Sequence, residues 1–416
     1  MTGPMPAPPP IDALQVIADL RELDQLTGGP GGARRLCWGE EWRTAREWLS
    51  GKLAALGLEP ERDEAGNLWA YLEGDREPAL GLGSHIDSVP SGGWLDGALG
   101  VAAALGVLRA YSESGIRPPR TLALVDFADE EGSRFGRSLF GSSAVAGTLD
   151  PAAVADLTDA EGNSISPVLA ENGVDLDEAP AAGARAERLG AYLELHIEQG
   201  PVLADQGSPC CAVAGCAGVE RVLFRFRGQA SHAGTTPMDV RRDAGLAAAT
   251  AALAVEEIAR TRGGVGTTGR LELEPGIVTA VAGVAELSVD LRHPEAGPLS
   301  EMLADARAVA QRVAADRGCE FIEEPIWSIA PIPFNPDLVE LATAASEAAG
   351  GLAAPLTSGA LHDAAEIAGL VPAVMVFSAS VAGISHAKEE DTREADLLAA
   401  INAYGGLTYG VLAAEL

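Results

Sequence analysis

The chain has 416 residues, of which 47% are hydrophobic, and its formal net charge at pH 7 is −31. This length favours two domains, and the acidic balance argues against nucleic acid and anionic membranes as partners, because both would repel the chain. No apolar run reaches transmembrane length, and the segment MTGPMPAPPP lacks the basic and apolar regions of a signal peptide. The five cysteines show no disulfide framework, which together with these features predicts a cytoplasmic protein.

Apolar periodicity in the first half of the chain alternates between helical and strand spacing. The predicted elements are a helix at 41–56, strands at 67–72 and 79–83, a helix at 99–111, and strands at 121–127 and 192–197. The run at 121–127 is continuously apolar, which is typical of a strand buried on both faces. This alternation predicts α/β layers around a mostly parallel sheet.

The middle of the chain has a different pattern, because charged and apolar residues alternate there. It predicts strands at 221–226, 270–274 and 286–292, with helices at 243–259 and 299–316. The α/β pattern then resumes with a helix at 338–348, a strand at 373–377 and a final helix from Thr392. We therefore predict an α/β catalytic domain formed by residues 1–217 and 330–416, with an α+β domain inserted at 218–329.

Histidines and carboxylates follow several of the predicted strands. In GSHIDSVPSGGWLDGALG, His85 comes directly after a strand, and Asp87 lies on the same side of the extended chain, where its carboxylate can receive the imidazole N–H. A glycine-rich loop then brings Asp96 to the start of a helix. His196 ends the strand of LELHIEQGP, and His386 follows the strand AVMVF through a loop.

Strand ends of open α/β sheets commonly hold functional sites, so these side chains are predicted to meet. Taken alone, the acidic run could be a solvated charge cluster, and each of the three histidines could have a structural role. Imidazole and carboxylate ligands together suit Zn, Mn, Co or Ni, and a shared carboxylate suits a site with two metal ions. Cys210, Cys211 and Cys216 have no second motif beside them and are predicted to be small buried residues, while His293 is predicted to lie on the surface.

The sequence LVDFADEEGSRFG places three acids at the end of a predicted strand. Adjacent residues there point in different directions, so one glutamate can bind a metal ion while its neighbour takes a proton from the attacking water. Asp129 is predicted to be only a support for Glu130 and Glu131.

Taken together, these motifs resemble the M20-type metallo-amidohydrolases of the hydantoinase/carbamoylase branch. That branch includes N-carbamoyl-L-amino acid hydrolases, β-ureidopropionases, and allantoate and ureidoglycolate amidohydrolases. The resemblance rests on GSHIDSVPSGGWLDGALGV, DEEGSRFGRSLFGS, LELHIEQGPVL, GQASHAGTTPMDVRRDA, SVDLRH, SGALHDA and GISHAKEE.

The resemblance implies a binuclear metal site and a catalytic base. His85 and His196 would hold one divalent ion, Glu131 and His386 would hold the other, and Asp96 would bridge them. Glu130 would be the general base.

The resemblance also implies a substrate site and a dimer. The inserted domain would be a lid that forms a homodimer, and His232 would stabilise the oxyanion in the partner subunit's site. The implied contacts to a small carboxylate-bearing substrate come from Gln199, Arg292, Gly359, Ala360 and His362. From the residues alone, Arg292 could instead be an exposed strand-end residue, and His362 could be a structural histidine beside Asp363.

Three positions depart from the family pattern. Thr279 stands where an Asn that contacts the substrate is expected, Ala282 replaces a Pro, and Leu361 replaces a Gly. The predicted function is hydrolysis of an N-carbamoyl-L-amino acid or a similar ureido acid. The alternatives are an allantoate, ureidoglycolate or N-acyl amino acid hydrolase on the same scaffold, or a binding protein without catalytic activity.

Overall fold

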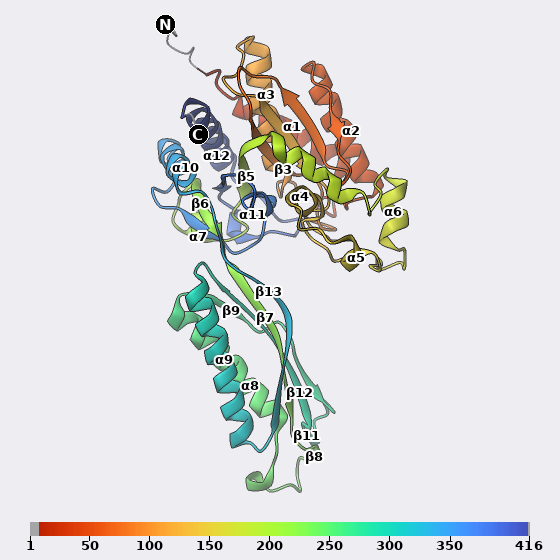
Figure 1. The fold of residues 1–416 in the computed structure, drawn as a ribbon. Helices are drawn as coiled ribbons and strands as arrows, with labels where there is room; N and C mark the ends of the chain where they lie inside the picture. Colours follow the sequence, from red (N-terminus) through yellow and green to blue (C-terminus); the bar gives the residue numbers. More distant parts are fainter. Residues whose placement is uncertain (1–7, 415–416) are drawn as a thin grey trace. The chain divides into compact units, whose positions relative to one another are not determined.

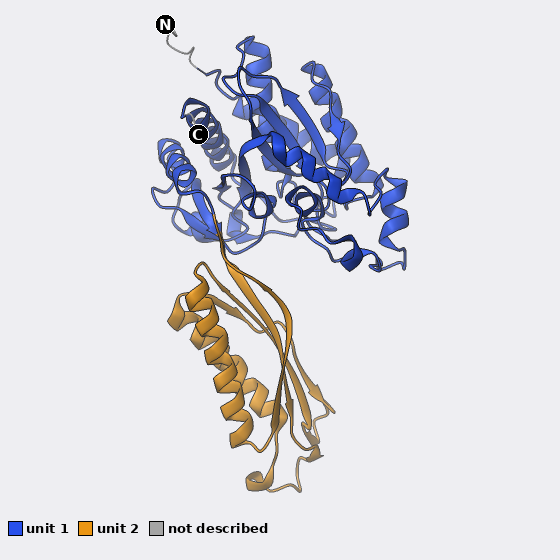
Figure 2. Ribbon diagram, in the orientation of Figure 1, with its two compact units in different colours: residues 1–215, 334–416 blue, residues 216–333 orange. Residues whose placement is uncertain are grey.

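The computed structural model describes residues 8–414, so the first seven residues of the lead segment lie outside the described residues. The chain forms two compact units (Figure 2). Unit 1 comprises Met1–Gly215 and Phe334–Leu416, and unit 2 comprises Cys216–Pro333. The predicted α/β architecture is confirmed: unit 1 contains a mixed sheet with a parallel centre, and unit 2 contains an antiparallel sheet.

The sheet of unit 1 has the strand order β1-β2-β4-β3-β5-β16-β6, and β15 pairs with β6. Its central neighbours β4, β3, β5 and β16 are parallel, whereas β2 and β6 pair antiparallel on the two flanks. The strands are β1 (Glu61–Arg62), β2 (Leu68–Leu72), β3 (Ala79–His85), β4 (Leu122–Phe127), β5 (Leu189–Ile197), β6 (Cys210–Cys216), β15 (Leu356–Ser358) and β16 (Ala373–Ser378). Every residue of β3, β4 and β16 is buried, as expected for strands covered on both faces.

Helices cover this sheet (Figure 1). Helices α3, α10 and α12 pack against it, while α4 and α11 form a second group that also contacts its strands. The helices of unit 1 are α1 (Ala13–Thr27), α2 (Glu40–Ala55), α3 (Ala98–Ser114), α4 (Phe140–Ala146), α5 (Pro151–Val154), α6 (Ile165–Glu171), η1 (Ala179–Arg188), α7 (Val202–Asp205), α10 (Pro336–Ala348), α11 (Asp363–Ile367), η3 (Val381–Gly383) and α12 (Glu394–Ala413). Within residues 8–414, no helix combines the length and apolarity that crossing a bilayer requires.

Unit 2 has the strand order β10-β12-β7-β13, with β9 paired to β12 and a separate β8–β11 pair. Helices α8 and α9 lie along one face of this sheet (Figure 1). The elements are β7 (Gly218–Arg227), β8 (Ser231–His232), η2 (Met238–Val240), α8 (Ala244–Arg262), β9 (Val265–Thr267), β10 (Leu271–Glu274), β11 (Ala280–Val281), β12 (Val284–His293), α9 (Ala296–Asp316), β13 (Glu320–Ile329) and β14 (Ile332–Pro333). Residues of β12 alternate between the buried helix side and the more open side of the sheet.

The prediction that His293 lies on the surface is wrong. It is only 6% exposed, because it falls on the inward phase of β12. Its Nδ1 accepts a hydrogen bond from the Glu295 amide at 2.9 Å, and its Nε2 lies 3.1 Å from the carbonyl oxygen of Arg262. His293 therefore joins the end of the strand to neighbouring backbone.

Strands β3 and β4 approach closely at Gly83. A Cβ atom added to Gly83 would lie 1.9 Å from the backbone oxygen of Val125. We expect Gly83→Ala to lower the free energy of unfolding by about 1–3 kcal/mol, because β3 and β4 would have to separate. Denaturant unfolding measures this, with Gly51→Ala in α2 as the control, since no heavy atom lies within 4 Å of its added Cβ. Equal unfolding midpoints for the two variants would contradict the close strand contact.

Candidate metal centre

The candidate ligands meet where the parallel strands of unit 1 end. His85 is the last residue of β3, and His196 is the penultimate residue of β5. Glu131 lies in the loop after β4, and His386 lies in the loop after β16. Their ligand atoms form two clusters, one of His85, Asp96 and His196 and one of Asp96, Glu131 and His386, each within 4.8 Å. Both clusters contain Asp96.

The two carboxylate oxygens of Asp96 face different clusters. Its Oδ1 lies 3.1 Å from Nε2 of His196 and 3.9 Å from Nε2 of His85. Its Oδ2 lies 3.4 Å from Nε2 of His386, and that same nitrogen lies 3.4 Å from Oε2 of Glu131. A carboxylate in this position suits a bridge between two cations.

Backbone carbonyl groups orient both buried histidines. Nδ1 of His196 lies 2.9 Å from the Ile197 oxygen, and Nδ1 of His85 lies 3.1 Å from the Asp87 oxygen. A carbonyl oxygen can only accept, so the proton of each neutral ring belongs on Nδ1 and the lone pair on Nε2. When the rings are neutral, as binding of a metal ion requires, both Nε2 atoms present a lone pair to the cluster.

The three acidic side chains in the loop after β4 have different partners. Oε2 of Glu130 lies 3.5 Å from Nε2 of His85, whereas Glu131 faces His386. Asp129 accepts a hydrogen bond from the Trp38 indole at 2.9 Å and belongs to neither cluster. The three adjacent acids therefore have three different environments.

Asp87 differs in detail from the expectation. Its carboxylate Oδ1 lies 3.7 Å from Nδ1 of His85, and the closer partner of that nitrogen is the main-chain oxygen of Asp87. The two carboxylate oxygens instead accept from the amides of Glu130 and Glu131, at 3.3 and 3.2 Å. Asp87 thus ties the β3 end to the β4 loop.

Burial and mutual repulsion shift the ionisation of this cluster. Burial, followed by repulsion from Asp363 and Glu131, holds the pKa of Glu130 well above its ordinary value. Burial and the charge of Asp96 raise the pKa of Glu131 to about 8. Such a concentration of buried carboxylates favours a divalent cation, whose charge would compensate theirs.

The two histidines respond differently to the same surroundings. Burial lowers the pKa of His85 to about 3. Burial acts in the same direction on His196, but the hydrogen bond and charge of Asp96 outweigh it and raise the pKa of His196 to about 9. The difference follows from the shorter distance between His196 and Asp96.

The turn before α3 requires glycine at position 97. Gly97 has a φ of +64°, and a Cβ there would lie 2.3 Å from Cε1 of His85. A side chain would therefore displace the imidazole that Asp96 approaches. This explains the Asp-Gly sequence between the loop and the helix.

A family model for peptidase family M20/M25/M40 matches residues 81–409. The N-carbamoyl-L-amino acid amidohydrolase of Geobacillus stearothermophilus is 37% identical over 91% of this chain and 93% of its own length. The allantoate amidohydrolase of Escherichia coli K12 is 35% identical over 91% of this chain and 93% of its own length. A crystal structure of a hydantoinase/carbamoylase family amidase from Burkholderia multivorans superposes with a TM-score of 0.88 at 32% identity, covering 96% of this chain and 98% of the other.

This chain belongs to peptidase family M20/M25/M40. The resemblance to its hydantoinase/carbamoylase branch is confirmed. Family M20 depends on metal ions, and the residues present fit that requirement, since two ligand clusters share one carboxylate and the buried Nε2 of His196 has no hydrogen-bond donor beside it.

Several residues that support the site were missed by the sequence reasoning. Glu390 accepts hydrogen bonds from the amides of Leu95 and Asp96 at 3.3 and 3.0 Å, and Ser385 donates to Oδ2 of Asp96 at 3.0 Å. Buried Arg35 donates from Nε to the Ile86 oxygen at 2.6 Å. Glu390 and Ser385 lie in the GISHAKEE motif, so proximity to His386 was an available signal, whereas nothing in the sequence pointed to Arg35.

A third cluster of potential ligands shares His196 with the first cluster and consists of Glu194, His196 and His362. The oxygens of Glu194 already accept from Ser84 Oγ at 2.7 Å and from the Ala364 amide at 2.8 Å. The His362 ring centroid is 4.3 Å from that of His196, and its Nε2 lies 2.9 Å from Ser358 Oγ. Because both Glu194 oxygens already accept hydrogen bonds and His196 Nε2 lies 3.1 Å from Asp96, this cluster is a weaker candidate for a metal site than the other two.

The remaining predicted substrate contacts are distributed over both units. In unit 1, Gln199 donates to Oδ2 of Asp96 at 2.9 Å, and the Ala360 amide donates to Ser358 Oγ at 3.1 Å, while Gly359 is exposed. In unit 2, Thr279 is exposed and Arg292 is half-buried.

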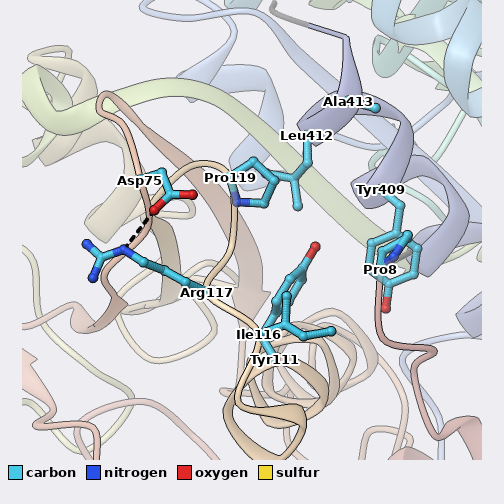
Figure 3. A pocket seen from close by; sticks show the side chains of 9 residues that line it. All are labelled: Pro8, Asp75, Tyr111, Ile116, Arg117, Pro119, Tyr409, Leu412 and Ala413. Carbon is cyan, nitrogen blue, oxygen red and sulfur yellow. Dashed lines mark ion pairs between the residues drawn. The ribbon is translucent and has the colours of Figure 1, made fainter. Parts of the chain in front are cut away.

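A separate pocket of about 370 Å³ lies between the C-terminal ends of α3 and α12 (Figure 3). Tyr111, Tyr409 and Leu412 supply much of its apolar wall, and Asp75 and Arg117 form an ion pair of 3.1 Å at its edge. No potential metal-ligand cluster of the described residues includes a residue that lines it. The candidate metal ligands therefore lie at the strand ends and not in this pocket.

Proposed function

We propose that this M20 protein is a binuclear metal-dependent amidohydrolase that cleaves the C–N bond of an N-carbamoyl-L-amino acid or a similar ureido acid. The observation that carries the proposal is the division of Asp96 between two ligand clusters, with Glu130 beside one of them. Relatives with this activity match more than nine tenths of the chain.

Two divalent ions would be held by the five candidate ligands. His85 and His196 would bind one ion, Glu131 and His386 the other, and Asp96 both. Zn, Mn, Co and Ni suit this mixture of imidazole and carboxylate. When bound, such ions would acidify a water molecule and polarise the substrate carbonyl group.

Glu130 would act as the proton carrier. It is 8% exposed, which leaves its carboxylate reachable but largely shielded from bulk water. In the proposed reaction Glu130 takes a proton from the attacking water and then donates it to the leaving amine nitrogen. The carbamate released from a carbamoyl substrate would decompose to ammonia and carbon dioxide.

The substrate carboxylate would be bound by Arg292, because a guanidinium group can donate two parallel hydrogen bonds to a carboxylate. We propose that Gln199 and backbone groups at Gly359 and Ala360 contact the polar parts of the substrate. For His362 we propose an indirect role, in which it holds the ring of His196 in place. Thr279 is shorter than the Asn expected there, and Leu361 is larger than Gly, so both positions would shape substrate preference.

An allantoate amidohydrolase is the second candidate, and the Escherichia coli relative favours it. Ureidoglycolate and N-acyl amino acid hydrolysis remain alternatives on the same scaffold. All five cysteines are free, so we also propose a cytoplasmic location.

A homodimer formed through unit 2, the proposed lid, is supported by its surface. Most exposed large apolar side chains of the described residues belong to this unit, including Leu253 at 72% and Val278 at 100% exposure. Exposed apolar groups gathered in one unit favour a protein interface. Met238, six residues after His232, is also exposed at 71%, and Ile277, three residues before the Ala280 that pairs with His232, is exposed at 58%.

His232 has the hydrogen-bonding arrangement that an oxyanion donor needs. Its Nδ1 accepts from the Gly234 amide at 3.1 Å, so the proton of the neutral ring belongs on the exposed Nε2. We propose that this N–H stabilises the oxyanion in the partner subunit's site.

We expect His232→Ala to lower kcat by about 100- to 1,000-fold while the protein stays dimeric, because one oxyanion donor is lost. Steady-state kinetics and analytical ultracentrifugation measure the two properties. His293→Gln, in the same unit but buried, controls for general disturbance of unit 2. Unchanged kcat in the His232→Ala dimer would contradict the proposed role.

The function itself is tested with a substrate panel. Purified protein, loaded with Zn²⁺ or Mn²⁺, is offered N-carbamoyl, N-formyl and N-acetyl amino acids and allantoate, and the release of ammonia and of free amino acid is measured. Ammonia from an N-carbamoyl-L-amino acid is the expected result. Hydrolysis of allantoate alone would select the second candidate, and no bound metal together with no hydrolysis would exclude the enzyme.

A further inference from the structure

The pocket between the C-terminal ends of α3 and α12 takes no part in the proposed reaction (Figure 3). Its volume of about 370 Å³ is in the range of sites that enclose small organic molecules. Tyr111 and Tyr409 face it, with ring centroids 6.2 Å apart and ring planes at 69° to each other. Much of the remaining wall is also apolar and comes from Ile116, Pro119 and Leu412. Such a wall suits a ligand with a flat, largely apolar body.

One polar group inside this pocket has no partner. Tyr111 is only 3% exposed, and its hydroxyl points away from α3 into the middle of the lining side chains (Figure 3). Within residues 8–414, no hydrogen bond satisfies this hydroxyl. The neighbouring Tyr409 differs, because its hydroxyl donates to the carbonyl oxygen of Pro9. A largely buried hydroxyl without a partner is unfavourable, so a molecule in the pocket that pairs with it would gain binding energy.

The Tyr111 hydroxyl is a neutral hydrogen-bond donor at physiological pH. Burial raises the pKa of Tyr111 to about 12, so the phenol keeps its proton. The O–H is the part of the group that most requires a partner, since buried donors without a partner are rarer in proteins than acceptor oxygens with a free lone pair. A carbonyl oxygen on the ligand would accept this hydrogen bond.

The charges around the pocket are already balanced. Among the described residues that line it, only Asp75 and Arg117 are charged, and they pair with each other at 3.1 Å. The carbonyl end of α12 also meets a cation, since Nη2 of Arg76 donates to the oxygen of Leu412 at 3.5 Å. A charged ligand would lose its hydration without a free counter-charge in the wall, so the pocket favours an uncharged one.

We propose that this pocket is a second binding site, which takes an uncharged, largely apolar ring compound whose carbonyl oxygen accepts a hydrogen bond from the Tyr111 hydroxyl. No potential metal-ligand cluster of the described residues includes a residue of its wall, so the proposal does not depend on the proposed amidohydrolase function. The site therefore binds its ligand equally well in metal-free and metal-loaded protein.

The test measures binding of three naphthalene probes to the full chain by equilibrium dialysis. The probes are 2-acetylnaphthalene, 2-ethylnaphthalene, which lacks the carbonyl oxygen, and the anion 2-naphthoate. We expect Tyr111→Phe, which keeps the ring, to weaken binding of the acetyl probe about fivefold and to leave the ethyl probe unchanged. Tyr71→Phe is the matched control, because Tyr71 lies on β2 and does not line the pocket. Ala413→Trp, which fills the pocket from its exposed edge, should weaken binding of both uncharged probes about tenfold or more.

Each outcome supports or overturns the proposed site. Wild-type binding by Ala413→Trp would place the probes elsewhere, and an equal loss of both uncharged probes in Tyr111→Phe would show that no hydrogen bond from the hydroxyl is used. Tighter binding of 2-naphthoate than of 2-acetylnaphthalene would overturn the choice of an uncharged ligand. Loss of binding on loading with Zn²⁺ would place the probe at the metal centre and overturn the second site, whereas the substrate panel would still test the proposed function.

Discussion

Replacing Glu130 with Gln is expected to abolish turnover while the protein keeps its metal ions. Gln has nearly the same shape, but its amide cannot take a proton from water, so we expect kcat to fall by about 100- to 10,000-fold. The candidate ligands, including His85 at 3.5 Å, would remain in place. Metal content by mass spectrometry and kcat for the best substrate of the panel are measured on the same preparation.

The control for this prediction is Glu389→Gln. Glu389 is exposed and contacts only Lys388 among the ion pairs of the described residues, at 3.9 Å. It should keep wild-type kcat, which excludes an effect of total charge near His386. If Glu130→Gln turned over within threefold of wild type, the proton would have to move through another group.

Replacing Asp96 with Asn is expected to weaken both metal sites together. Each Asp96 oxygen faces its own cluster, so loss of the carboxylate charge removes an anionic ligand from both. We expect the apparent affinity for Zn²⁺ or Mn²⁺ to fall by at least about 100-fold and turnover to be lost. The number of ions retained after dialysis against limiting metal is the measurement.

His386→Gln provides the comparison, because His386 belongs to one cluster only. It should lose about one ion per chain where Asp96→Asn loses both. Treatment of the wild type with a chelator should likewise remove activity, and added metal should restore it. Retention of two ions by Asp96→Asn would show that the clusters do not share this carboxylate.

Much of the architecture could be predicted because its signals are local. The apolar run at 121–127 corresponds to β4 (Leu122–Phe127), and the helical spacing at 243–259 overlaps α8 (Ala244–Arg262). The position of His85 and His196 at the ends of parallel strands follows from the alternation of helices and strands alone. The grouping of these residues with Asp96 could therefore be predicted from the sequence.

Other features depended on contacts between distant segments. His293 was predicted to lie on the surface because its motif did not show which face of the strand it occupies. In the structure it lies on the buried face of β12. The carboxylate of Asp87 was assigned to His85, but the loop after β4 brings two amides closer to it. Arg35 had no local signal at all, since its partner at Ile86 is 51 residues away in the chain.

The sequence by itself determined the order of the elements, the residue types at the strand ends and the family of the protein, because periodicity and motifs are properties of neighbouring residues. Only the tertiary structure decided how the oxygens of Asp96 are shared and which carboxylate faces which histidine. It also decided that Arg221 and Arg292 meet on Asp290, a contact that depends on the register between β7 and β12. Register and loop closure are set by packing across the whole fold, which no local pattern records.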